Sequence, residues 1–178
     1  MTKIVLVDDD ENILRSLKRA LARQKWTVLT FSNPEQALEE LAFTEVDLVI
    51  SDYRMPGMSG VEFLKAFKET HKDTIRLILS GQADLDGLME AINEVEVYRF
   101  ITKPWNDSEL VMMIRQALEF NRLQQENRKL ADIVRAQSKT LQTQLTELKR
   151  LESESPGITH IDWDEDGSID LSNEYSDL

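Results

Sequence analysis

The sequence contains no cysteine among its 178 residues. Disulfides, thiolate zinc sites and cysteine nucleophiles are therefore excluded within it. Long apolar runs are also missing near the amino terminus. The first run, Ile4–Val7, is short and leads directly into aspartate, so it predicts neither a signal peptide nor a membrane span. We expect a cytoplasmic protein without membrane contact.

Positive charge is absent from the last part of the sequence. The net charge is −12, and the segment from Glu152 onward has nine acidic residues and no Lys or Arg. Subtracting this −9 leaves −3 for the first 151 residues. The acidity therefore belongs mainly to a tail. No basic face is evident, so direct binding of nucleic acid by this chain is not expected.

Five short apolar runs alternate with amphipathic stretches. Runs that are apolar on both faces suit the strands of a buried parallel sheet, and the stretches between them have the spacing of helices with one apolar stripe. Five such units within the first 120 residues predict an α/β fold, a doubly wound five-stranded parallel sheet with right-handed crossovers. The predicted strands are residues 4–7, 27–31, 47–51, 75–79 and 97–102, and residues 85–92 are predicted to form the fourth helix.

A long helix is predicted from Asp107 to Glu152, because this stretch contains neither glycine nor proline. A heptad repeat can be placed from Phe120 to Leu151, with apolar residues at most core positions. Two core positions of this repeat are glutamine, Gln137 and Gln144, which weakens it. We expect a homodimeric coiled coil through residues 120–151. The alternative is a helix that folds back on its own domain.

The acidic tail has two possible interpretations. Its alternating apolar and polar residues predict a small β-hairpin after the break at Pro156-Gly157. Asp162, Asp164 and Asp166 also match the first half of a calcium-binding loop, but the twelfth position is Asn173 instead of a bidentate acid. The predicted domains are therefore a body of residues 1–120, a helical extension of residues 121–153, and a tail of residues 154–178.

Polar residues follow four of the predicted strands. Asp8-Asp9-Asp10 comes after the first, Asp52 after the third, Ser80 after the fourth and Lys103 after the fifth. The carboxyl ends of parallel strands are where ligands bind in this type of sheet. Clustered carboxylates suit Mg²⁺, an aspartate can accept a phosphoryl group, and a lysine can neutralise phosphate.

At these places the sequence resembles the receiver domains of two-component response regulators. Four segments match in order and together specify the family: Ile4–Asp9, Asp47–Gly60, Leu77–Gly81 and Phe100–Pro104. The resemblance covers residues 3 to about 120 and implies a flavodoxin-like sheet with strand order 2-1-3-4-5.

The resemblance implies a phospho-acceptor site that depends on Mg²⁺. Asp52 would accept the phosphoryl group from a histidine kinase. Mg²⁺ would be held by Asp8, Asp9 and Asp52, together with the backbone carbonyl of Arg54. Lys103 would pair with the phosphoryl oxygens.

The resemblance also implies two switch residues. The Ser80 hydroxyl would move toward the phosphoryl group, and Phe100 stands where the family has its aromatic switch. The peptide bond between Lys103 and Pro104 is expected to be cis. Such a protein is a switch that phosphorylates and dephosphorylates itself, and not a turnover enzyme. It would act on a downstream protein or output domain that the sequence does not identify.

Two other functions remain open. The first is a Mg²⁺-dependent phosphatase with an aspartyl nucleophile. Such enzymes carry Asp-x-Asp-x-Thr after the first strand, and here Asp8 and Asp10 fit but Asn12 stands in place of the threonine. The second is a receiver retained only as an unphosphorylated scaffold, against which the complete set of acids, hydroxyl and lysine argues.

Overall fold

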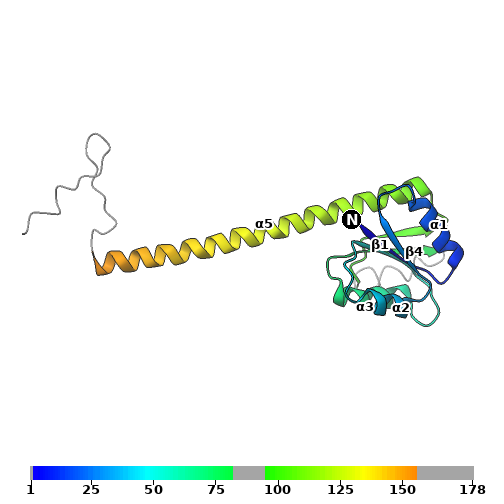
Figure 1. Cartoon of the computed structure of the whole chain (residues 1–178), viewed down its shortest axis with the longest axis horizontal. Coiled ribbons are helices and arrows are strands. Elements are labelled where there is room, and N and C mark those ends of the chain that lie inside the picture. The colour runs from blue at the N-terminus through cyan, green and yellow to red at the C-terminus, as the bar shows by residue number, and fades with distance from the viewer. Residues whose placement is uncertain (1, 82–94, 156–178) are drawn as a thin grey trace, which may run out of the picture. The chain divides into compact units, whose positions relative to one another are not determined.

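The computed structural model describes residues 2–81 and 95–155. These residues contain one parallel sheet of five strands in the order β2-β1-β3-β4-β5 (Figure 1). This result confirms the predicted sheet and its order. The strands are β1 (Lys3–Val7), β2 (Thr27–Phe31), β3 (Leu48–Asp52), β4 (Ile75–Gly81) and β5 (Arg99–Lys103).

Helices follow the strands wherever the described residues cover the connection. They are α1 (Glu11–Leu21), α2 (Pro34–Leu41), α3 (Gly60–Thr70) and α5 (Asp107–Glu154). Side-chain caps fix where all four begin, because each cap satisfies a free backbone N–H group of the first turn. Asp10 caps α1, Asn33 caps α2, and Ser59 caps α3 in a reciprocal capping box with Glu62. At α5, the side chain of Asn106 accepts hydrogen bonds from the N–H groups of Ser108 and Glu109.

Two apolar cores lie on opposite faces of the sheet. One is formed with α2 and α3 and contains the rings of Phe63 and Phe67. The other is formed with α1 and the first part of α5, and it contains Leu17 and Ile114. Figure 1 shows the two pairs of helices on either side of the strands. The sheet is thus covered on both faces, and its carboxyl edge stays open for a site.

The fifth strand differs from the prediction at its ends. It spans Arg99–Lys103, whereas the apolar run predicted residues 97–102. Val97 is buried, so the apolar pattern reports its packing correctly. Its backbone, however, lies before the ladder, which begins where Arg99 pairs with Leu77. Lys103 belongs to the strand itself and is not part of the loop after it.

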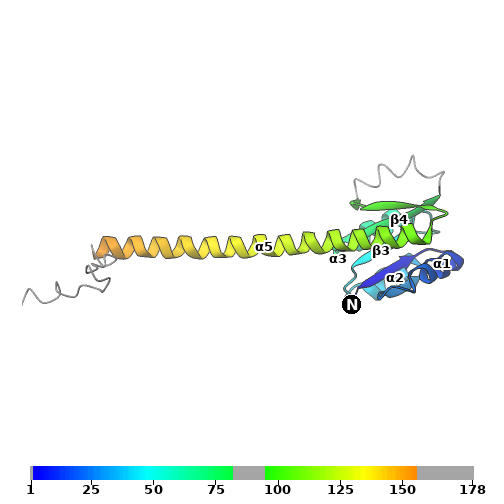
Figure 2. The same cartoon turned by 90° about the horizontal axis from the view of Figure 1, so that it is seen from above.

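Helix α5 is a single helix of 48 residues, as the absence of glycine and proline predicts. It ends at Glu154, just before the predicted break at Pro156. Its last buried residue is Ala117, and Asn121 donates a 2.8 Å hydrogen bond to the carbonyl of Asp73. Figure 2 shows the helix continuing without a break beyond this point. Residues 1–126 and 127–178 form two compact units.

Several predictions lie outside the described residues. They are the fourth helix at residues 85–92, the β-hairpin of the tail and the possible calcium loop. Among the helices of residues 2–81 and 95–155, none has a stretch long and apolar enough to cross a bilayer.

Candidate functional site

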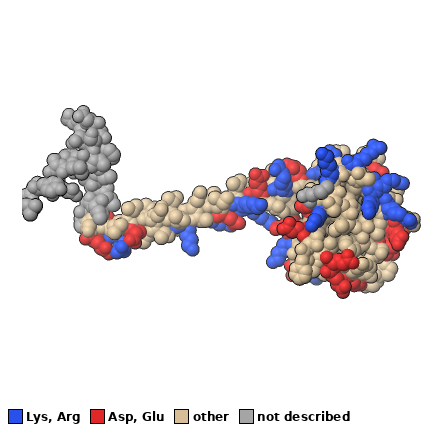
Figure 3. All heavy atoms as spheres, in the orientation of Figure 1, with Lys and Arg blue, Asp and Glu red and all other residues tan. Residues whose placement is uncertain are grey.

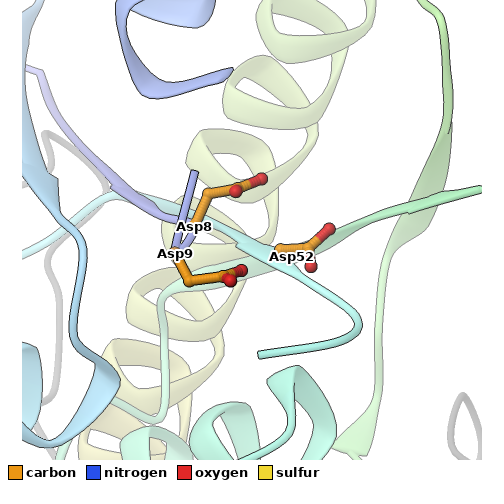
Figure 4. Close-up of side chains that lie close together, drawn as sticks. All are labelled: Asp8, Asp9 and Asp52. Atoms are coloured by element: carbon orange, nitrogen blue, oxygen red, sulfur yellow. The ribbon is translucent and has the colours of Figure 1, made fainter. Parts of the chain in front are cut away.

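Three carboxylates lie together at the carboxyl edge of the sheet. Asp8 and Asp9 directly follow β1, and Asp52 is the last residue of β3. Because β1 and β3 pair directly, these ends meet, and one oxygen from each carboxylate lies within 4.8 Å of the others. Figure 4 shows the three side chains close together. Asp8 and Asp52 are buried, whereas Asp9 is exposed, so the cluster is accessible from solvent.

Lys103 adds a positive charge to this cluster. Its Nζ lies 2.6 Å from Oδ1 of Asp52 and donates a hydrogen bond of 2.9 Å to Oδ2 of Asp8. The peptide bond to Pro104 is cis, as the resemblance implies. One ammonium group thus contacts both buried carboxylates.

Burial and charge act against each other at this site. Burial raises the pKa of Asp8 above its usual value and outweighs the hydrogen bonds that Asp8 accepts from Lys103 and the backbone of Asp10. Burial also disfavours the charge on Lys103, but its hydrogen bonds to Asp52 and Asp8 raise its pKa overall. The lysine therefore stays cationic. The ionised form of Asp8 would gain from further positive charge, which a divalent cation would supply.

Backbone N–H groups orient the two buried carboxylates. Oδ1 of Asp8 accepts a hydrogen bond of 2.9 Å from the N–H of Asp10. Oδ2 of Asp52 accepts one of 3.0 Å from the N–H of Arg54. Each carboxylate therefore has one oxygen held by backbone and the other in contact with Lys103. Fixed carboxylates need little rearrangement when a cation or phosphoryl group arrives.

Gly60 is a site residue that sequence reasoning missed. A Cβ at this position would lie only 1.9 Å from the backbone oxygen of Asp52. The N–H of Gly60 also donates a hydrogen bond of 3.0 Å to the carbonyl of Tyr53. The start of α3 therefore packs directly on the backbone of the Asp52 segment. The sequence shows the glycine but not its contact with Asp52, because that contact depends on how α3 packs against the end of β3.

The two predicted switch residues lie on neighbouring strands. Ser80 is almost fully buried on β4, pairs with Thr102 of β5, and is one residue beyond the ladder partner of Asp52. Phe100, on β5, is 38% exposed. Ser80 therefore lies at the same edge as the acidic cluster, whereas Phe100 lies three residues before Lys103 on an edge strand.

Comparison with known proteins identifies the family. The sequence profile of the response regulator receiver domain matches residues 4–115, well over half of the chain. This chain belongs to the response-regulator receiver family. Its acidic cluster is of the kind that forms the Mg²⁺ site in receivers. The residues fit that ion, because Mg²⁺ prefers carboxylate oxygens and keeps some of its waters.

The curated relatives are longer proteins. The hydrogenase transcriptional regulatory protein HoxA of Cupriavidus necator is 37% identical over 120 residues, which cover 67% of this chain and 25% of HoxA. The DNA-binding transcriptional regulator NtrC of Escherichia coli is 36% identical over 123 residues, which cover 69% of this chain and 26% of NtrC. The chain therefore matches about a quarter of the length of these relatives.

Solved receiver structures match over nearly their whole length. The signal receiver domain of an HD domain-containing protein from Pseudomonas fluorescens Pf-5 is 41% identical with a TM-score of 0.64, covering 68% of this chain and 97% of that domain. An uncharacterized protein from Neptuniibacter caesariensis is 40% identical with a TM-score of 0.67, and the match covers 71% of this chain and 93% of that protein. The similarity thus extends over the receiver part of the chain.

Proposed function

We propose that this protein is a phosphorylation-dependent switch in which Asp52 accepts a phosphoryl group from a histidine kinase in the presence of Mg²⁺. The observation that carries the proposal is the contact of Lys103 with Asp52 inside an acidic cluster. A receiver domain implies a cognate kinase, and because kinases of this kind use cytoplasmic ATP, we propose that the chain acts in the cytoplasm.

The transfer step follows from the contacts of Asp52. A carboxylate oxygen of Asp52 forms a bond to the phosphorus, and the bond from phosphorus to the donor imidazole nitrogen breaks. The imidazole leaves as a neutral group once it has a proton. Lys103, already 2.6 Å from Oδ1 of Asp52, pairs with the phosphoryl oxygens, whose charge it offsets.

Magnesium would be held by Asp8, Asp9 and Asp52, with the backbone carbonyl of Arg54 as a further ligand. When bound, the ion neutralises charge on the acceptor and on the incoming phosphoryl group. Asp9, the exposed member of the cluster, would keep a position for the ion next to solvent. Asp8 would gain most from the ion, because burial already raises its pKa.

A hollow beside Lys103 supports approach of the donor from the α1 side. It is an open depression of about 460 Å³ between α1 and the start of α5. Arg19 and Trp105 line it together with Lys103. Figure 3 shows Lys and Arg side chains gathered at the end of the body where Figure 1 places α1. We propose that the kinase contacts this side of the domain while its phosphohistidine reaches Asp52.

The signal would leave the site through Ser80, Phe100 and α5. Ser80 would move toward the phosphoryl oxygens and Phe100 would change its packing. A change at β5 reaches α5 directly, because the two elements pack in one core. We propose the division into a receiver of residues 1–120, a helical extension of residues 121–153 and an acidic tail of residues 154–178.

The proposed output is a parallel homodimer through residues 120–151. Large apolar side chains along this part of α5 are about half exposed, and each would contribute roughly 1.5–3 kcal/mol if fully buried. The relatives include transcriptional regulators and an HD domain-containing protein, so receivers of this type serve different outputs. We propose that the dimer presents a partner-binding end to a downstream protein or output domain.

Intact-mass spectrometry with acetyl phosphate tests the phosphorylation. We expect one phosphoryl group on each chain, formed only with Mg²⁺ and lasting long enough to be measured. Sustained release of phosphate from an ester such as p-nitrophenyl phosphate would instead favour the phosphatase. The structure gives a reason against the phosphatase: Asp10 accepts hydrogen bonds from Asn12 as a helix cap. If the chain is not phosphorylated under any of these conditions, the remaining function is that of an unphosphorylated scaffold.

Light scattering tests the dimer. The full chain should have the mass of two chains at tens of micromolar, and a version ending at Asn121 should have the mass of one. A monomeric full chain, with and without beryllium fluoride as a phosphoryl mimic, would contradict the dimeric output but not the phosphorylation at Asp52.

A further inference from the structure

Nine large apolar side chains of α5 are between 47% and 59% exposed, and beyond Phe120 six of them lie on one side of the helix. These six are Leu123, Leu130, Val134, Leu141, Leu145 and Leu148. Along the sequence, the first five of these residues are separated alternately by seven and by four positions. Five of the six positions also belong to the predicted heptad repeat, and Leu145, four residues after Leu141, is the one that departs from it.

The mixed spacing keeps all six side chains on one side of a straight helix. An α-helix turns about 100° per residue, and by this measure the six positions lie within an arc of about 60°. A strict heptad stripe would instead drift about 20° per heptad, which forces two helices to supercoil. Each four-residue step turns about 40° the opposite way, and the last step of three residues turns back about 60°, so the six positions show little net drift. The six side chains therefore form an apolar line that runs parallel to the helix axis.

We propose that this apolar line packs in parallel and in register against the same line of a second copy, with little supercoiling. This arrangement rests on the proposed dimer and assigns it different core residues. In the predicted heptad, Gln144 is a core residue and Leu145 lies beside the core. In the straight pair, Leu145 lies about 30° from the middle of the line and Gln144 about 70° from it, so Leu145 is the core residue.

A second copy fits this line because its neighbours cause little repulsion. Uncharged polar residues flank the middle of the line: Gln137, Ser138, Gln142 and Gln144. Figure 3 shows few charged side chains along this part of the helix. Asn127 falls on the same line and would meet its own copy, as a core asparagine does in two-stranded coils.

The line has a defined end. Glu152 falls at the same angle as Val134, which places a carboxylate directly in line after Leu148. Two such carboxylates would repel each other across a parallel pair. The paired stretch should therefore stop before Glu152. A straight pair of this kind would carry a tilt or rotation of α5 from the receiver to Leu148 without winding a supercoil.

Disulfide cross-linking distinguishes the two core arrangements, since the chain has no cysteine of its own. Single variants Leu145→Cys and Gln144→Cys of the full chain are oxidised under mild conditions, with Thr143→Cys on the opposite side of the helix as control. We expect Leu145→Cys to cross-link several-fold faster than Gln144→Cys. Thr143→Cys should show only the slow rate of random collision.

A second pair of cysteine variants tests the same core arrangement without removing an apolar side chain. Gln137→Cys and Ser138→Cys flank the line about equally in the straight pair, so they should cross-link at similar rates. In a regular heptad, Gln137→Cys would be much faster. Dominance of Gln144→Cys and Gln137→Cys would overturn the straight pair while keeping the dimer. A dimeric chain without any cross-link would overturn the parallel register. A monomer by light scattering would show that the proposed dimer itself is wrong.

Discussion

The ring of Tyr98 lies 5.5 Å from the ring of Phe120, at an interplanar angle of 39°. Tyr98 directly precedes β5, and Phe120 lies on α5 three residues before the apolar line begins. The contact therefore joins the strand that carries Lys103 and Phe100 to the part of α5 that leads toward the proposed dimer. It is a packing contact between the residue before β5 and α5.

This aromatic contact should be measurable in a double-mutant cycle. Tyr98→Ala, Phe120→Ala and the double variant should give a coupling of about 0.5–1.5 kcal/mol, the range for aromatic pairs. Urea unfolding of the full chain measures it. Phe43→Ala is the control, because Phe43 is fully exposed and should change stability by less than about 0.5 kcal/mol. Additive effects of the two alanine variants would show that the rings are not coupled.

Removal of the lysine should destabilise the protein most when magnesium is absent. Lys103→Met leaves Asp8 and Asp52 without their cation. We expect a loss of about 1–3 kcal/mol, below the cost of breaking a fully buried pair, because the Lys103 side chain is 26% exposed. Mg²⁺ should restore part of this loss. Thermal unfolding with and without Mg²⁺ tests the prediction. If Mg²⁺ raises the unfolding temperature of the variant and of the wild type by the same amount, the prediction is wrong.

Asp9 and Asp10 are neighbours with different expected roles. Asp9→Ala should weaken Mg²⁺ binding at least tenfold and reduce phosphorylation accordingly, because it removes one carboxylate from the cluster. Asp10→Ala should lower stability through loss of the α1 cap but keep the Mg²⁺ affinity. Isothermal titration with Mg²⁺ compares the two. Wild-type affinity in Asp9→Ala would remove Asp9 from the metal site.

Gly60 and Gly57 offer a matched pair of substitutions near the site. Gly60→Ala places a methyl group against the backbone oxygen of Asp52, so it should cost about 1–3 kcal/mol by overpacking and slow phosphorylation. Gly57→Ala should cost about 1 kcal/mol because of its positive φ of 83°, with little effect on phosphorylation. Urea unfolding and the rate of acetyl phosphate labelling test both. If Gly60→Ala and Gly57→Ala are labelled at the same rate, the packing of Gly60 does not affect phosphorylation of Asp52.

Local patterns predicted much of this site because its residues follow strands directly. Asp8, Asp52 and Lys103 each come at the end of an apolar run, and a parallel sheet brings such ends together. The capping pair Ser59 and Glu62 was also readable from its spacing, although it was not predicted.

Contacts between distant segments could not be predicted in this way. Arg76 would ordinarily be expected on the surface. It is buried on β4 and donates hydrogen bonds to the carbonyls of Thr74 and Val95. Its partners include the turn before β5, and their positions depend on the folded chain. The shared contact of Lys103 with two carboxylates depends likewise on the pairing of four strands, β1, β3, β4 and β5.

Peptide mapping of the phosphorylated chain tests the central claim most directly. The protein is labelled with acetyl phosphate and Mg²⁺, digested, and the modified carboxylate is located by mass spectrometry, with Asp52→Asn as the control. The account predicts a phosphoryl group on Asp52 alone and none in the control. Label on Asp8 or Asp9, or equal labelling of Asp52→Asn, would contradict it.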